Sequence, residues 1–223
     1  MLSGWDGAAS RRLSRVDVFE QLRTRLVNGE WHPGQVVQEQ VLAVELNVSK
    51  TPVREALQLL ALQGMVRPVN RVGYVVSPID LSDVVEVFQY RVLLETDLTA
   101  QLASLPSAKL EVVRKDEESP VLNHETVCSE MAFHRMLYES LSQPRRQANL
   151  SVLVDQTARA IVYVGLAQSL LNLLEDEHKQ IYHAVAARDS ELARSLMAVH
   201  LSHLRDSVLA KLRQQLREQE NLL

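Results

Sequence analysis

Four side chains in the second half of the sequence are of the types that bind a divalent metal ion. Glu130 and His134 lie four positions apart, which places both on one face of the same expected helix. His178 begins or lies within a later expected helix, and His200 lies in the last one. Imidazole nitrogens with one carboxylate oxygen suit zinc first, with nickel and manganese as alternatives. Three helices could therefore bring four ligands to one ion and leave coordination positions for water or a small acid.

The same residues admit a second interpretation, because histidines at helical intervals are common. Such a cluster can also satisfy its polar atoms through mutual hydrogen bonds and water. His183 and His203 lie near the candidate ligands but miss the pattern, so we place them outside the ligand set. A metal-dependent hydrolase is the alternative from another class, yet no residue is identifiable as the separate general base that a catalytic zinc site needs. We therefore expect a protein that is not an enzyme.

The helices that must position these side chains follow from the spacing of apolar residues. Beyond Pro78, apolar positions recur at intervals of three and four, without strand-like alternation. The expected helices span Leu81–Leu105, Glu125–Leu141, Gln147–Leu171, Leu173–Arg188 and Ser190–Arg217. The segment Pro106–Asn123 between the first two is charged and irregular. Residues 79–223 are therefore predicted to form an all-helical domain.

A different pattern fills the first part of the chain. Residues 1–14 show no sustained period and are expected to form a flexible leader. Three short helices then follow, near Val16–Asn28, near Val41–Leu46 and over Ser49–Gln63. A β-hairpin comes after them, with strands at Met65–Val69 and Gly73–Val76. This order predicts a winged helix-turn-helix over residues 15–78, and a chain that is mainly α with one small β-hairpin wing.

The charge distribution agrees with a DNA-binding first domain. Residues 1–78 contain nine Lys or Arg against seven Asp or Glu, whereas residues 79–223 contain fifteen against twenty-one. Lys50, Thr51 and Arg54 lie on the first turns of the third helix. Cationic side chains and open backbone N–H groups at that position can meet phosphates and base edges. We therefore expect double-stranded DNA as a partner.

Composition excludes several other classes of protein. Of the 223 residues, 46% are hydrophobic and 23% are charged, a balance typical of a folded protein. The single cysteine, Cys128, cannot form an intramolecular disulfide, which suits a reducing cytoplasm. The longest apolar stretch, Ala160–Ala167, is far shorter than the ~18 residues that a membrane span needs. We expect a cytoplasmic protein with no membrane partner.

The segment Ser49–Leu57, preceded by Pro33-Gly34 and followed by Gly64, resembles the GntR family of bacterial transcription regulators over about residues 16–78. The resemblance implies a homodimer on an inverted-repeat operator, with Arg54 reading a base. It implies further DNA contacts near this arginine, at Gln40, Ser49, Lys50 and Thr51. It also implies that the wing reaches the minor groove through Asn70, Arg71 and Gly73. The family often has arginine where this chain has Gln40 and Lys50, and lysine cannot make arginine's two-pronged contact to guanine. The operator is therefore expected to differ from the family's usual one.

The pairs Phe133-His134, Glu177-His178 and His200-Leu201 resemble the FCD domain of the FadR-like branch of that family, over roughly residues 79–217. Many members bind a metal ion there through an aspartate and three histidines. The resemblance assigns these roles to Glu130, His134, His178 and His200. Because Glu130 is one methylene longer than the usual aspartate, altered or weaker coordination is expected.

Arg91 matches an arginine of this domain that, in related regulators, can meet the carboxylate of an effector. A buried guanidinium offers such an anion a charge-assisted, two-pronged hydrogen bond. A structural ion pair within the same bundle is the competing interpretation. The resemblance implies a regulator, commonly a repressor, whose operator affinity depends on a small carboxylate in a metal-containing pocket of an effector-binding and dimerisation domain. A metal-free pocket for a longer acyl ligand is the alternative that remains open.

Overall fold

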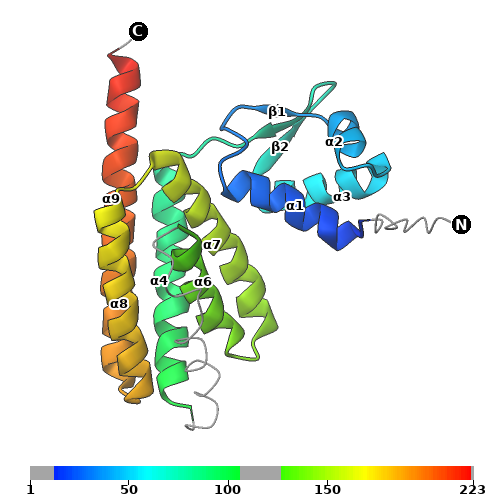
Figure 1. The fold of residues 1–223 in the computed structure, drawn as a ribbon. Coiled ribbons are helices and arrows are strands. Elements are labelled where there is room, and N and C mark those ends of the chain that lie inside the picture. Colours follow the sequence, from blue (N-terminus) through cyan, green and yellow to red (C-terminus); the bar gives the residue numbers. More distant parts are fainter. Residues whose placement is uncertain (1–12, 106–126, 222–223) are drawn as a thin grey trace, which may run out of the picture. The chain divides into compact units, whose positions relative to one another are not determined.

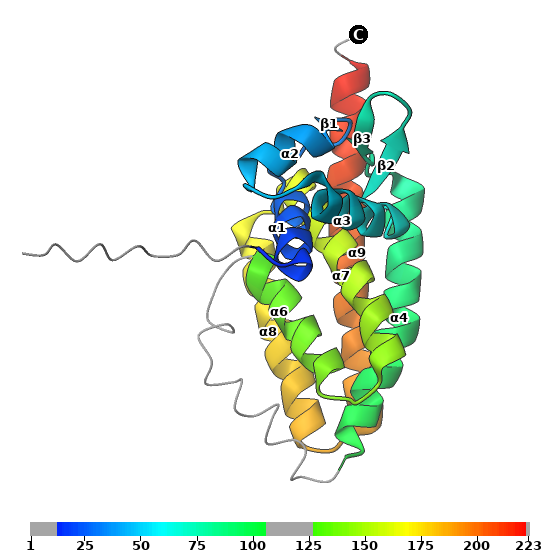
Figure 2. The same ribbon diagram turned by 90° about the vertical axis from the view of Figure 1, so that its right-hand side faces the viewer.

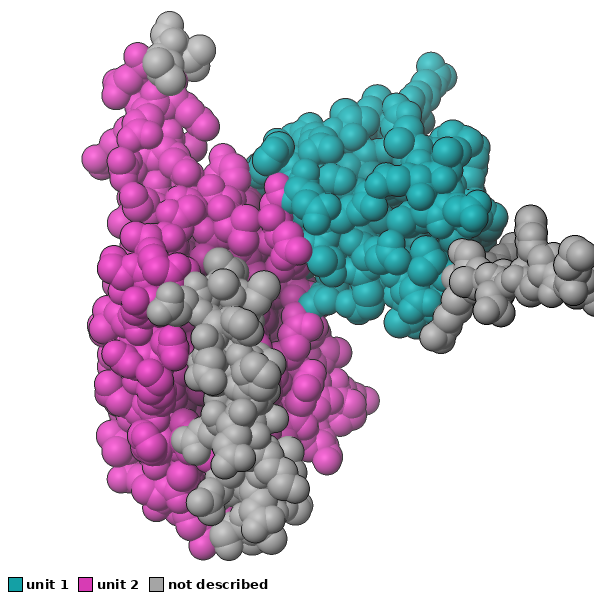
Figure 3. Space-filling model, in the orientation of Figure 1, with its two compact units in different colours: residues 1–26, 30–78 teal, residues 27–29, 79–223 magenta. Residues whose placement is uncertain are grey.

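The computed structural model describes residues 13–105 and 127–221 (Figure 1). The chain divides into two compact units, coloured separately in Figure 3: unit 1 runs to Pro78 without residues 27–29, and unit 2 comprises residues 27–29 and the chain from Ile79 onward. Residues 1–12 of the expected leader and the irregular segment 106–123 lie outside the described residues. All candidate metal ligands lie in unit 2, and all candidate DNA contacts lie in unit 1.

Unit 1 packs three helices and a small sheet around one apolar core. The helices are α1 (Arg15–Val27), α2 (Glu39–Glu45) and α3 (Lys50–Leu62). The apolar faces that the spacing predicted are buried, with Leu22 and Leu26 of α1 in the same core as Leu57 and Leu60 of α3. Asn47, in the turn between α2 and α3, has a positive φ of 52°. The short turn and the shared core hold α2 and α3 together as a helix-turn-helix.

The wing is a three-stranded antiparallel sheet, whereas the sequence predicted only a two-stranded hairpin. The strands are β1 (Val36–Val37), β2 (Val66–Val69) and β3 (Gly73–Val76), in the order β1-β3-β2. In the added pair, Val36 lies opposite Val75 and Val37 lies opposite Tyr74. A strand of two residues is too short to show alternation, so periodicity had no means of detecting β1.

The third strand explains why residue 73 is a glycine. Gly73 has a φ of 123°, a backbone conformation that residues with a side chain rarely adopt. A Cβ atom built at this position would lie 2.7 Å from the carbonyl oxygen of Val37. The close approach of β1 therefore requires glycine here, independently of any contact with DNA.

Unit 2 is a helical bundle, as the periodicity predicted. Its described helices are α4 (Leu81–Ala103), α6 (Val127–Glu139), α7 (Pro144–Val164), α8 (Gln168–Ala186) and α9 (Ser190–Glu220). Helix α9 packs against α4 and α8, and α6 packs against α7 (Figures 1 and 2). Among the described residues, no helix combines the length and apolar character needed to span a membrane.

The predicted helix Gln147–Leu171 was wrong at its C-terminal end. Helix α7 ends at Val164, and α8 begins at Gln168. Gly165 closes α7 in the left-handed conformation, with a φ of 61°. The helical spacing of apolar residues continues across this break because the same core receives side chains from both sides of it, including Leu166 and Leu170.

Candidate functional site

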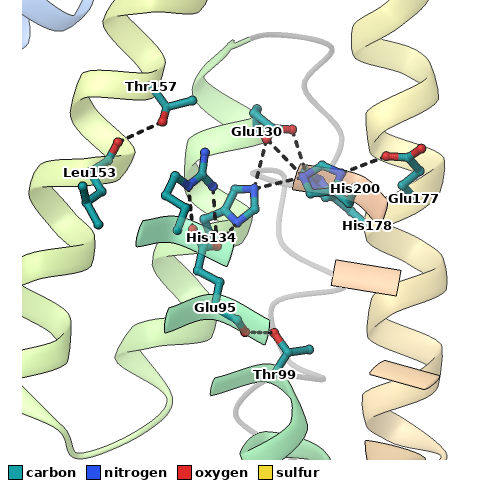
Figure 4. A network of polar contacts seen from close by, with 10 residues as sticks. Glu95, Thr99, Glu130, His134, Leu153, Thr157, Glu177, His178 and His200 are labelled. Atoms are coloured by element: carbon teal, nitrogen blue, oxygen red, sulfur yellow. Dashed lines mark hydrogen bonds and ion pairs between the residues drawn. The ribbon is translucent and has the colours of Figure 1, made fainter. Parts of the chain in front are cut away.

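The four candidate metal ligands meet inside unit 2 (Figure 4). Glu130 and His134 come from α6, His178 from α8 and His200 from α9. One donor atom of each residue lies within 4.8 Å of the others, and all four residues are buried. In the part of the chain that the structure describes, this is the one cluster of three or more His, Cys, Asp or Glu arranged in this way.

The Nε2 atoms of the three histidines face one another. His134 Nε2 and His178 Nε2 lie 3.1 and 3.2 Å from His200 Nε2. Glu130 Oε1 lies 3.0 Å from His134 Nε2 and 3.3 Å from His200 Nε2. Glu130 Oε2 lies 3.1 Å from His178 Nε2. Both carboxylate oxygens therefore face the histidines, so the extra methylene of glutamate does not carry the carboxylate away from them.

Two further carboxylates contact the Nδ1 atoms of two of these histidines, on the side of the ring that faces away from the cluster. Glu95 Oε2 lies 2.5 Å from Nδ1 of His134, and Glu177 Oε2 lies 2.9 Å from Nδ1 of His200. Burial alone would raise the pKa of Glu95, but Arg91 and His134 lower it to about 2, so this carboxylate is ionised. Because an ionised carboxylate only accepts hydrogen bonds, Nδ1 donates, and in the neutral form of the imidazole Nε2 then keeps its lone pair.

This arrangement fits a cation at the centre. With Nδ1 protonated in His134 and His200, the two Nε2 lone pairs face each other across 3.1 Å, an arrangement that requires a proton or a metal ion between them. Burial lowers the pKa of His178 to about 4 despite Glu130, which favours its neutral, ligand form. Burial would also lower the pKa of His200, but Glu130 and Glu177 raise it to about 9. The cluster therefore stabilises positive charge, and its donor set suits a divalent metal ion.

The outer network reaches the surface through His203. Nδ1 of His203 lies 2.5 Å from Oε1 of Glu177, and 52% of the His203 side chain is exposed. Glu177 thus joins the buried His200 to an exposed histidine. Neither the roles of Glu95 and Glu177 nor the contact of His203 with Glu177 is predictable from the sequence, because spacing does not show which carboxylate faces the outer nitrogen of a ligand.

Arg91 is fully buried on α4 beside the cluster. Its Nε donates a hydrogen bond to Glu95 Oε1 at 2.6 Å, and its Nη2 lies 3.4 Å from Glu95 Oε2. Glu95 also holds His134, so a guanidinium, a carboxylate and an imidazole form one chain. Within the described residues, Nη1 of Arg91 makes no hydrogen bond. The structural ion pair, which competes with effector binding as the role of Arg91, is therefore present with Glu95. Nη1 of Arg91 is left for another acceptor.

Replacing Arg91 with alanine is expected to lower the stability of unit 2 by about 3 kcal/mol, because Glu95 would keep a buried charge without its main partner. For a chain of this size that corresponds to a fall in melting temperature of roughly 6–12 °C. Thermal unfolding of the full chain measures it. The double variant Arg91→Ala with Glu95→Gln should recover part of the loss. An unchanged melting temperature would leave effector binding as the only role of Arg91.

The eight candidate DNA contacts share unit 1, and all except Gly73 are exposed. Ser49 is the N-cap of α3, and its hydroxyl makes no capping hydrogen bond. Lys50, Thr51 and Arg54 follow in the first two turns of α3, and Gln40 lies on the first turn of α2. The start of α3 therefore combines cationic and hydroxyl side chains with the open N–H groups of a helix terminus.

The remaining candidates lie at the tip of the wing. Asn70 and Arg71 join β2 to β3, and Arg71 has a left-handed φ of 61°. Both residues are exposed. Gly73 begins β3, where the neighbouring β1 strand already accounts for its residue type. Asn70 and Arg71 thus present the polar groups of the wing.

Two family models match this chain in the order of its two units. The model described as "Bacterial regulatory proteins, gntR family" matches residues 15–76, and the model "FCD domain" matches residues 86–203. A winged helix-turn-helix followed by a helical bundle that encloses a histidine cluster defines a two-domain transcription regulator. The named relatives support the same class.

The chain is 27% identical over 202 residues to "Uncharacterized HTH-type transcriptional regulator YdhC" of Bacillus subtilis (strain 168), covering 84% of this chain and 88% of that protein. It is 30% identical over 210 residues to "Probable D-xylose utilization operon transcriptional repressor" of Paenarthrobacter nicotinovorans, covering 87% and 90%. The solved structure "E. coli McbR/YncC" shares the fold with a TM-score of 0.74 at 19% identity, covering 91% and 99%. This chain belongs to the GntR family of bacterial transcription regulators and carries an FCD domain.

Proposed function

We propose that this regulator is a cytoplasmic, homodimeric repressor whose operator affinity is controlled by a small carboxylate bound at a divalent metal ion in unit 2. The observation that carries the proposal is the buried cluster of Glu130 and three histidines, with its Nε2 atoms turned toward one another. No other group of three or more His, Cys, Asp or Glu in the described bundle gathers its donor atoms in this way.

The charges of the buried network support a divalent ion. Glu95, Glu130 and Glu177 each have a pKa below the ordinary value, because their basic partners outweigh the effect of burial. Arg91 supplies one positive charge, so two negative charges, one of them on the half-buried Glu177, remain when all three imidazoles are in the neutral form that binds a metal ion. Uncompensated buried charge is costly, and one divalent ion offsets it. Imidazole and carboxylate donors favour zinc, with nickel and manganese as alternatives.

Each residue of the network has a distinct part in this proposal. Glu130 and the three histidines would hold the ion, and Glu95 and Glu177 would keep two of those histidines oriented. A bound ion would supply open coordination positions to a small carboxylate. The buried Nη1 group of Arg91, which has no hydrogen-bond partner among the described residues, would donate a charge-assisted hydrogen bond to the same class of anion.

The exposed polar side chains at the start of α3 and at the tip of the wing support operator binding. A twofold dimer would present two α3 helices to the two halves of an inverted repeat. A relative at 30% identity is named a probable repressor of a D-xylose utilization operon, which favours repression. An effector that binds one dimer arrangement more tightly would change the spacing of the α3 helices, and with it the affinity for DNA.

In the test of this proposal, we expect at least one mono-, di- or tricarboxylic acid of two to six carbons to raise the melting temperature of the metal-loaded chain. The same acid should change its affinity for DNA by about 5- to 150-fold, the usual range of coupling between two sites. The DNA is a site that the protein itself selects from a random duplex library. Fluorescence anisotropy and thermal unfolding provide the two readouts.

The control in this experiment is His178→Ala, in which both responses to the acid should disappear. Short acids that alter neither readout would contradict the carboxylate effector. If longer acyl compounds alter both readouts in protein without metal, the pocket is the metal-free alternative.

A further inference from the structure

Glu39 on α2 forms an ion pair with Arg54, the arginine that is proposed to read the operator. Arg54 Nε lies 3.1 Å from Oε1 and 3.0 Å from Oε2 of Glu39, and Arg54 Nη2 lies 2.9 Å from Oε2. Glu39 is in the first turn of α2, and Arg54 is in the second turn of α3. The side chain of Glu39 is 22% exposed and that of Arg54 is 56% exposed. The pair therefore lies at the exposed face of the helix-turn-helix, with the carboxylate as its more buried member.

The geometry of this pair leaves a defined part of the guanidinium available. Glu39 accepts from the edge formed by Nε and Nη2, which is one of two edges that can make a two-pronged contact. The other edge, formed by Nη1 and the second N–H of Nη2, keeps its donors. That edge has the spacing to meet O6 and N7 of a guanine in the major groove.

Glu39 also changes what the guanidinium prefers to bind. An arginine without a partner can turn among many rotamers and is attracted to any nearby phosphate. With Glu39 engaged, the pair has no net charge, so its attraction to phosphate is reduced. The hydrogen bonds offered to a base edge depend on donor geometry and remain.

Resting on the proposed operator binding by Arg54, we propose that Glu39 is a specificity-determining residue: it fixes the direction of the Arg54 guanidinium and turns a general phosphate contact into a base contact. Glu39 itself is a positioning residue that acts through Arg54. Burial, and then Glu39, raise the pKa of Tyr74 on β3, which is consistent with the phenol lying beside the pair. The carboxylate thus joins the first turn of α2 to the second turn of α3.

The test compares the full chain with Glu39→Gln, which keeps the side-chain length and removes the charge. Each protein selects duplexes from a random library, and its affinities for the selected site and for random DNA are measured across a salt series. For Glu39→Gln we expect the ratio of specific to non-specific affinity to fall by about tenfold, the discrimination carried by one two-pronged base contact. Affinity for random DNA should rise and depend more steeply on salt.

Glu45→Gln is the matched control, because Glu45 is another glutamate of α2 paired with an arginine, Arg25, at 2.7 Å. It should leave the specificity ratio unchanged. Equal tightening on specific and random DNA in Glu39→Gln would overturn the proposal, since Glu39 would then only repel DNA. An unchanged selected sequence and ratio would overturn it as well. If the parent chain selects no sequence, operator binding itself fails, a result distinct from an unaffected Glu39→Gln.

Discussion

Exchanging His178 for alanine is expected to reduce bound metal from about one equivalent per chain to below about one tenth, because losing a ligand costs more than the 10- to 100-fold in affinity that losing an outer partner costs. His178 supplies a buried Nε2 that lies 3.1 Å from Glu130 and 3.2 Å from His200. Elemental analysis of the dialysed protein measures the effect. The protein is purified without a histidine tag or chelator, so that no other site contributes metal.

His183→Ala is the matched control for this prediction. His183 lies on the same helix, α8, but is exposed and is not part of the cluster. Its replacement should leave the metal content at the parent value. A parent chain that contains no metal and takes up none on titration would contradict the metal centre. Full metal content in His178→Ala would remove His178 from the ligand set.

Arg54→Ala is expected to weaken binding to the selected operator by about 100-fold or more. One two-pronged contact to guanine is worth about 1–3 kcal/mol, and a dimer would lose two of them. The side chain of Arg54 is exposed and forms a surface ion pair with Glu39. Because surface ion pairs contribute little to stability, the melting temperature should change little. Fluorescence anisotropy with operator and with random duplex measures the two affinities.

The comparison variant for Arg54 is Arg205→Ala, which removes the same charge from unit 2. Arg205 is partly exposed and pairs with its neighbour Asp206 on α9. Its operator affinity should stay close to that of the parent. If Arg54→Ala loses as much affinity for random DNA as for the operator, Arg54 contacts phosphate and the assignment of base reading is wrong.

The helical bundle and the helix-turn-helix were predictable because each depends on periodic burial of apolar residues. Leu57 and Leu60 of α3 are buried at the spacing that the sequence displays. The break at Gly165 was missed for the same reason, since apolar residues keep helical spacing on both sides of it. In the sequence, only Gly165 marks the end of α7, and a single glycine also occurs within helices.

The candidate metal ligands could be named from residue type, spacing and family resemblance, whereas their outer partners could not. A histidine and a glutamate four apart on one helix share a face whatever the tertiary structure. Glu95 comes from α4 and Glu177 from α8, and their contacts with His134 and His200 depend on how the helices are rotated in the bundle. Arg91 shows the same limit, because the sequence offered an ion pair and an effector contact without showing that one guanidinium has groups for both.

The pairing of Val36 and Val37 with β3 restrains the wing by adding a third, paired strand to its hairpin. The hairpin is clamped from the α1–α2 segment, so the separation between the start of α3 and the tip at Asn70 is built into unit 1. In a DNA-binding protein with this arrangement, the fold itself sets the distance between the start of α3 and the tip of the wing. Under the proposed contact of the wing with the minor groove, a duplex whose minor groove does not meet the tip would have to bend or narrow to fit, at a cost that depends on its stacking and flexibility. Base pairs that no side chain touches would then contribute to operator choice.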